Sequence, residues 1–293
     1  MRLSDKPAKL AAVQGNIFPT ARSLVRDWDT FRWHRNTFTK EVDADVPWSS
    51  QALCLSVWGT VASTEGADVR IAVGRACDDP LVAKAIEDAV GGVTPELVEP
   101  VLLNEMGGEP TNLDVVVEVD SLIVVIESKL SERLGGCGQL KKRHCSGIYG
   151  PGSDLKYRTP APCRLTIPDR ARTARSYWTV MDALAGGPFA PVGSPCPFEG
   201  PGYQVMRTIA SAARLGELRR KDWRVVFAFP FSLGGTTLAD VAAVQNRLKP
   251  EHRARVGSLD YDTLSAALVA CESDVARELG RHMAARIAAG RNQ

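Results

Sequence analysis

The sequence predicts one α/β domain in which helices cover a mixed β-sheet. Two runs rich in β-branched residues, 115–117 and 122–126, flank the polar pair Asp120-Ser121, a pattern typical of a β-hairpin. A third apolar run, at residues 224–231, predicts another strand. Segments with helical periodicity lie before, between and after these strands. This order of elements implies a sheet with helices packed on it.

The composition is that of an ordinary globular protein. Of the 293 residues, 44% are hydrophobic and 24% are charged, so the chain can bury a sizeable core. No stretch approaches the ~20 consecutive apolar residues that cross a membrane, and no apolar run typical of a secretory signal follows the first basic residues. The 7 cysteines are widely scattered, which favours reduced thiols and a cytoplasmic location.

The first part of the chain, residues 1–47, contains short apolar clusters without a clear period. We expect it to form an N-terminal extension of one or two helices packed on the core. In the next segment Ser49 or Ser50 is a suitable N-cap, and apolar residues then recur at helical spacing. A second helix is expected at residues 81–90, where Gly91-Gly92 would end it.

Further along the chain, residues 98–103 are expected to form a strand that leads through a link rich in Gly, Pro and Asn into the hairpin. Helical periodicity returns at residues 171–184. Apolar residues at helical spacing between positions 264 and 287 predict one long amphipathic C-terminal helix. We therefore expect a core at residues 48–235 and a helical segment at residues 236–293 packed on it.

The hairpin gathers three charged residues at one end. A two-residue turn at residues 120–121 places Asp114 directly opposite Glu127, where Cβ atoms are about 4.5–5.5 Å apart. Lys129 lies two residues beyond Glu127 and therefore points to the same face. Two carboxylates this close call for a compensating cation, and a divalent metal with oxygen ligands supplies one. A solvated strand end is the alternative, but the apolar second strand and the register favour the metal site.

Two other features of the sequence stay open. A third acidic ligand is not identified: Glu99, Glu105 and Glu109 are candidates, but an exposed strand-end or loop position is the favoured explanation for each. Between residues 139 and 175 the sequence has nine Lys or Arg residues and two acidic ones. This segment is either a solvated loop or a face that suits a polyanionic substrate.

Asp114, followed after twelve residues by Glu127-Ser128-Lys129, resembles the D-x(n)-(D/E)-x-K signature of the PD-(D/E)XK, or restriction-endonuclease-like, nuclease superfamily. In that superfamily the signature lies on a central hairpin. Gln139, on the helix expected after the second strand, matches a glutamine found in several branches, and Leu113 stands where the signature has proline. The likeness extends over roughly residues 48–231 and is greatest to an uncharacterised bacterial branch.

The resemblance implies a restriction-endonuclease-like core and hydrolysis of DNA phosphodiester bonds with Mg²⁺ or Mn²⁺, in restriction, defence or DNA processing. It implies that Asp114, Glu127 and the main-chain carbonyl of Ser128 bind the metal. It also implies that Lys129 orients or deprotonates the attacking water and offsets the developing negative charge. Gln139 would position the water, a metal ligand or the phosphate. Candidate contacts to the DNA backbone are Lys141, Lys142 and Arg143. A homodimer is one assembly that the sequence leaves open.

Three alternatives remain beside this interpretation. One is a catalytically inactive DNA-binding or interaction module with the same fold, which would bind DNA without cutting it. The second is an unrelated α/β enzyme, but neither G-x-G-x-x-G nor G-x-S-x-G occurs. The third concerns an additional zinc site, because five possible ligands lie in one loop-rich region: Cys137, His144, Cys145, Cys163 and Cys196. No C-x₂-C pair occurs among them, so scattered buried thiols are the favoured explanation.

Overall fold

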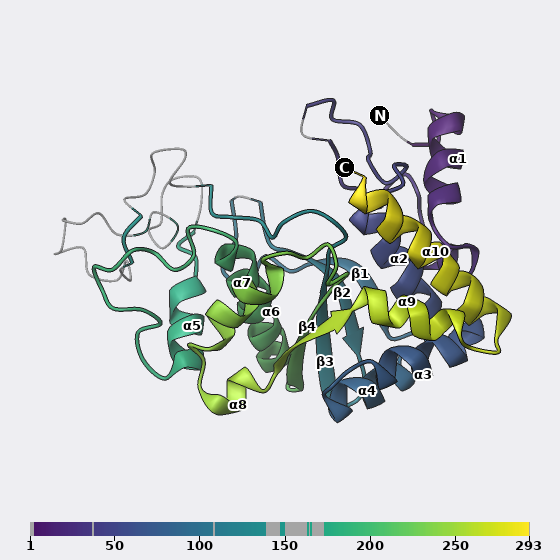
Figure 1. Ribbon diagram of the computed structural model, residues 1–293. Helices are drawn as coiled ribbons and strands as arrows, with labels where there is room; N and C mark the ends of the chain where they lie inside the picture. Colours follow the sequence, from purple (N-terminus) through teal and green to yellow (C-terminus); the bar gives the residue numbers. More distant parts are fainter. Residues whose placement is uncertain are drawn as a thin grey trace.

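A computed structural model describes residues 3–36, 38–107, 109–138, 147–149, 163, 165 and 173–292. In this part of the chain a five-stranded sheet has the order β1-β2-β3-β4-β5. Strand β2 pairs antiparallel with both β1 and β3, and β4 and β5 continue the sheet parallel to β3. The strands are β1 (Val93–Val98), β2 (Asn112–Glu118), β3 (Leu122–Ser128), β4 (Asp222–Phe229) and β5 (Val256–Asp260). The mixed sheet expected from the sequence is therefore confirmed (Figure 1).

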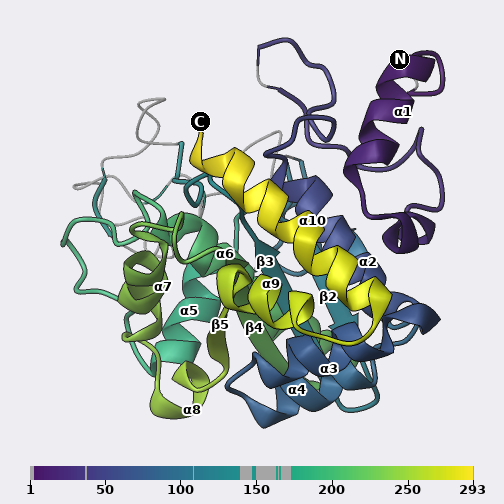
Figure 2. The same cartoon turned by 45° about the vertical axis from the view of Figure 1, so that its right-hand side comes forward.

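Helices cover both faces of this sheet (Figures 1 and 2). One layer contains α2 (Ser50–Ala62), α3 (Ala67–Arg75), α4 (Pro80–Glu87), α9 (Tyr261–Val269) and α10 (Asp274–Arg291). The other layer contains α5 (Tyr177–Ala185), α6 (Gly202–Arg219) and α7 (Thr237–Gln245), with the short α8 (Pro250–Arg253) near one end. Because side chains alternate along a strand, Val124 joins the hydrophobic cluster of the first layer, whereas Val125 joins that of the second.

The predicted hairpin has the predicted register. Val115 pairs with Ile126 and Glu118 pairs with Ile123, which is the pairing that a two-residue turn at positions 120–121 produces. Every residue of β3 is buried, because helices pack on both of its faces. A strand buried on both faces can carry charged side chains only where it ends, so the site forms at the end of β3.

The N-terminal extension packs on the first helix layer. It contains α1 (Pro7–Asn16) and the 3-10 helix η1 (Pro19–Leu24), and Val13 belongs to the same buried cluster as Val115. The helix predicted after residue 48 is α2, capped by the Ser49 hydroxyl, which accepts a hydrogen bond from the Ala52 N–H at 3.3 Å. The domain boundaries expected near residues 47 and 235 stay predictions.

Three sequence expectations were wrong in detail. The strand expected at residues 98–103 lies earlier, at β1, and residues 100–104 form turns instead. The single C-terminal helix is two helices, α9 and α10, since Ser273 caps a new helix with its hydroxyl. The helix expected at 171–184 begins at Tyr177. Strand β5 and helix α7 were not predicted. No helix in the described ranges is long and apolar enough to cross a bilayer.

Candidate active site

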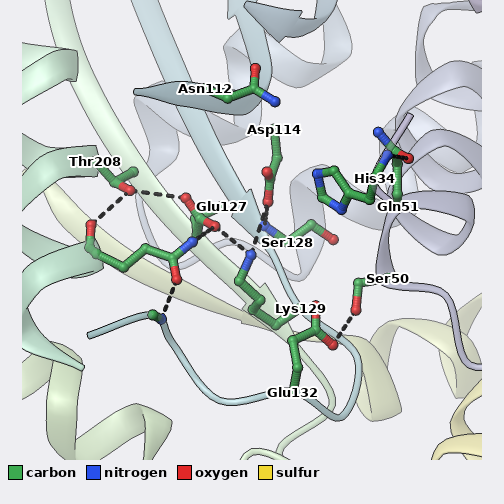
Figure 3. Close-up of polar contacts among 12 residues, drawn as sticks. His34, Ser50, Gln51, Asn112, Asp114, Glu127, Ser128, Lys129, Glu132 and Thr208 are labelled. Carbon is green, nitrogen blue, oxygen red and sulfur yellow. Dashed lines mark hydrogen bonds and ion pairs between the residues drawn. The ribbon is translucent and has the colours of Figure 1, made fainter. Parts of the chain in front are cut away.

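Asp114, Glu127 and Lys129 converge at one end of the hairpin (Figure 3). The ammonium Nζ of Lys129 lies 2.6 Å from Glu127 Oε1 and 3.5 Å from Asp114 Oδ2. The backbone N–H of Ser128 donates to Asp114 Oδ2 at 2.9 Å, which holds this carboxylate across the two strands. The structure therefore brings together the three side chains that the register placed on one face.

Burial and the neighbouring charges alter the pKa values of Glu127 and Lys129. Glu127 is 2% exposed; burial, together with the Asp114 carboxylate and against the opposing effect of Lys129, raises its pKa to about 7. Burial also opposes the charge on Lys129, but the two carboxylates outweigh it and raise the pKa of this lysine well above its ordinary value. Lys129 is thus an ammonium ion, and the two acids create a place that strongly favours positive charge.

Helix α6 fixes the orientation of Glu127. The side-chain amide of Gln204 donates from Nε2 to Glu127 Oε1 at 2.5 Å, and the hydroxyl of Thr208 donates to Oε2 at 2.9 Å. Gln204 is itself held because its Oε1 accepts a hydrogen bond from the backbone N–H of Gly135. Sequence reasoning gave the amide role to Gln139, which lies outside the described residues. Gln204 was not among the site residues expected from the sequence.

The acid that the structure places beside Asp114 is Glu96 of β1. Pro95 pairs with Val115 and Leu97 with Leu113, so Glu96 lies opposite Asp114. Sequence reasoning missed Glu96 because the expected strand began two residues later, at position 98.

The sequence suggested three acidic residues as a third metal ligand. In the described part of the chain, none of them has a hydrogen bond or ion pair with Glu96 or Asp114. Glu105 is buried and accepts hydrogen bonds from Thr111 and Tyr177. Glu99 faces Arg219, with 3.9 Å between their charged atoms. Glu109 precedes β2 on the exposed surface.

Glu96 adopts an unusual backbone conformation, with φ of 52°. A non-glycine residue in this left-handed region costs on the order of 1–2 kcal/mol, so surrounding contacts must hold it. Gln51 supplies one of them, since its Nε2 donates to Glu96 Oε1 at 2.6 Å, and the Asn112 amide donates to the other carboxylate oxygen. Strain of this kind clusters at functional sites.

The N-terminal extension adds a histidine to this group. His34 Nε2 lies 3.8 Å from Glu96 Oε1, and the His34 backbone N–H donates to Gln51 Oε1 at 2.8 Å. One ligand atom each from His34, Glu96 and Asp114 lie within 4.8 Å of one another, close enough to hold one metal ion. Gln51 thus connects the extension to the acidic group.

The donor set fits a hard divalent cation. Carboxylate oxygens are the ligands that Mg²⁺ takes from proteins, and an imidazole nitrogen is compatible with Mn²⁺. The role expected for the Ser128 carbonyl stays a prediction. The candidate DNA contacts Lys141, Lys142 and Arg143 lie outside the described residues, as do the possible zinc ligands His144 and Cys145.

Comparison with known proteins identifies the family of the chain. A family model described as restriction endonuclease associating with ARP matches residues 17–282. This range includes every strand of the sheet, the histidine of the N-terminal extension and the acids of the site. No curated protein and no solved structure matches the chain. Because the family match spans most of the sequence, the chain belongs to the family of restriction endonucleases associating with ARP.

Proposed function

We propose that this protein hydrolyses phosphodiester bonds of DNA with Mg²⁺ or Mn²⁺ as its cofactor. The observation that carries the proposal is the convergence of Asp114, Glu127 and Lys129 at one end of the β2–β3 hairpin. Membership of a restriction endonuclease family supports DNA as the substrate.

The acids of the site would hold the cation. Asp114 and Glu96 supply carboxylates, and His34 an imidazole, that lie close enough together to hold one ion. Glu127 adds a carboxylate from β3, opposite Asp114. A bound cation of this kind polarises the phosphate and lowers the pKa of a water molecule. Gln204 and Thr208 keep the Glu127 carboxylate in one orientation, which limits the reorganisation needed when the ion and the DNA bind.

Lys129 would act through its charge. Because the neighbouring carboxylates raise its pKa, the ammonium group keeps its proton and is a poor general base. It would instead orient the attacking water by donating a hydrogen bond and offset the negative charge that develops on the phosphate. Its contact with Glu127 holds it beside the carboxylates that would bind the metal.

Cleavage of supercoiled plasmid tests the proposal. The wild type, Lys129→Ala and the control Lys221→Ala are incubated with plasmid in Mg²⁺, in Mn²⁺ or in excess chelator. Lys221 forms a similar ion pair with Glu118, at 2.8 Å, at the opposite end of β2. We expect cleavage by the wild type and by Lys221→Ala in either metal, a loss of about a hundredfold or more in Lys129→Ala, and no cleavage in chelator.

Two results would contradict the proposal. Equal cleavage by the wild type and Lys129→Ala would assign the activity to a contaminant or to another site. Binding of DNA by the wild type without cleavage in either metal would instead indicate the inactive DNA-binding module.

A further inference from the structure

Arg207 of α6 places a cation close to the acidic site. On the helix it lies between Gln204 and Thr208, the two residues that contact Glu127. Its Nε donates at 2.8 Å to the hydroxyl of Thr111, which directly precedes β2. The guanidinium is therefore held at the same end of the sheet as the carboxylates.

Two further contacts hold the Arg207 guanidinium in place. Its Nη2 lies 3.4 Å from Glu105 Oε1, and its Cζ lies 5.3 Å from the centroid of the Tyr203 ring, in a cation–π contact. The buried Glu105 is fixed in turn by Tyr177, whose hydroxyl donates to Oε1 at 2.5 Å. The guanidinium is thus preorganised, and little side-chain freedom would be lost when it binds a ligand.

These contacts leave part of the hydrogen-bonding capacity of Arg207 unused. A guanidinium has five N–H donors, and the hydrogen bonds to Thr111 and Glu105 occupy two of them. Within the residues that the structure describes, the other donors, including both on Nη1, have no hydrogen-bond partner. They are available to a ligand with several acceptor oxygens.

The charge of Arg207 is also more available than that of Lys129. Lys129 is shared by two carboxylates, the nearer at 2.6 Å, and its side chain is 11% exposed. Arg207 faces the single carboxylate of Glu105, at 3.4 Å, and its side chain is 23% exposed. A backbone phosphate that approaches the acids of the site needs a further positive charge, and the planar donors of arginine match phosphate oxygens.

We propose, on the basis of the function proposed above, that Arg207 binds a backbone phosphate of the DNA beside the acidic site. Its remaining N–H groups would donate hydrogen bonds to the non-bridging oxygens of this phosphate. Glu105, Thr111 and Tyr203 then have a positioning role, because they hold the guanidinium while its other donors contact the DNA. Such a contact fixes the position of the duplex without reading its sequence.

The salt dependence of DNA binding tests this inference without any cleavage. A labelled duplex is titrated with the wild type and with Arg207→Gln in Ca²⁺, which replaces Mg²⁺, at salt concentrations between about 50 and 200 mM, and electrophoresis checks that the duplex stays intact. We expect Arg207→Gln to bind more weakly whatever the sequence, and the slope of log affinity against log salt to become shallower by about one unit. An unchanged affinity and slope would overturn the inference.

Two matched variants separate phosphate binding from a structural role. Arg214→Gln removes an arginine of the same helix that also pairs with a glutamate, Glu217, and it should keep the wild-type slope. Glu105→Gln removes the charge of the partner but keeps Arg207, so the affinity for DNA should stay the same or rise. If Arg207→Gln and Glu105→Gln weakened binding alike and left the slope unchanged, the ion pair would serve only the fold and the inference would be refuted.

A measurement on the wild type does not depend on how well the variants fold. An arginine-specific dicarbonyl reagent is applied with and without the duplex, and mass spectrometry of peptides locates the modified residues. We expect DNA to protect Arg207 and to leave Arg214 reactive. Equal modification of Arg207 with and without DNA, or no modification of it in the free protein, would contradict the inference.

The outcomes for this inference and for the proposed function can be told apart, because both measurements report binding and not cleavage. A protein that binds DNA through Arg207 but does not cut it would refute the proposed function alone. A protein that cuts DNA, and whose Arg207→Gln variant binds it with the wild-type slope, would refute the role of Arg207 alone.

Discussion

The side-chain amide of Gln204 joins the carboxylate of Glu127, with its Nε2 donating to Oε1 at 2.5 Å. The two residues are far apart in sequence, one at the end of β3 and the other on the first turn of α6. The contact links α6, a helix of the second layer, to the carboxylate whose pKa is raised to about 7 at the site. It makes Gln204 a positioning residue for the cation that Glu127 would bind.

Replacement of Gln204 by Ala should lower the efficiency of the site without unfolding it. Glu127 would keep its contacts with Thr208 and Lys129, but its carboxylate could rotate. Loss of such an orienting contact typically costs 10–100-fold in metal affinity or activity. We expect the Mg²⁺ concentration for half-maximal cleavage to rise and the rate at saturating Mg²⁺ to fall. Gln14→Ala on α1 is the control, and equal Mg²⁺ dependence of the two variants would argue against a positioning role.

Glu96→Gln should weaken metal binding directly. The amide keeps the size of the side chain but removes the charge from the group that includes Asp114 and His34. We expect the affinity for Mn²⁺, measured by calorimetry without DNA, to fall by about tenfold or more, equivalent to about 1.4 kcal/mol. The matched control is Glu99→Gln, since Glu99 faces Arg219. If Glu99→Gln lost more Mn²⁺ affinity than Glu96→Gln, Glu99 and not Glu96 would be the better candidate for the third acidic ligand.

Two glycines should respond to alanine in opposite directions. A Cβ at Gly59 of α2 would lie 2.7 Å from both the Cβ and the carbonyl oxygen of Ala21, so Gly59→Ala should destabilise the fold by about 1–3 kcal/mol. Nothing lies within 4 Å of a Cβ at Gly15 of α1, so Gly15→Ala should stabilise it by about 0.5–1 kcal/mol. Urea unfolding measures both changes. A Gly59→Ala protein as stable as the wild type would show that η1 does not pack closely on α2.

The stability of the fold should fall in mild acid because of His282. Burial, assisted by Arg286 and Arg22, lowers the pKa of His282 from 6.5 to about 4. The unfolded chain therefore binds this proton more readily than the folded one between those values, so stability is complete above pH 6.5 and declines as the pH falls toward 4. Near pH 5 the loss should be about 1–2 kcal/mol.

The variant His282→Gln isolates this effect. It removes the titrating group from a position where the imidazole lies 3.3 Å from the Ser56 hydroxyl. We expect the difference in unfolding free energy between pH 7 and pH 5 to shrink by about 1–2 kcal/mol relative to the wild type. An unchanged pH dependence would mean that other groups cause the acid sensitivity.

The parts of the fold that could be predicted depended on short-range patterns. The hairpin followed from β-branched runs around a polar pair, and α2 followed from an N-cap before apolar residues at helical spacing. The strand β1 was misplaced because Glu96 breaks regular β geometry with its positive φ. The short β5 and α7 lack a periodic signal long enough to identify them. The break between α9 and α10 was missed because the apolar spacing continues across Ser273.

Asp114, Glu127 and Lys129 could be assigned to one face from the residues alone, because a two-residue turn and the alternation of side chains fix the register over a few positions. Glu96, His34 and Gln204 were decided only by tertiary packing. They come from a neighbouring strand, from the N-terminal extension and from a helix on the opposite layer. Their approach depends on how distant segments bury their apolar surfaces, which no local pattern encodes.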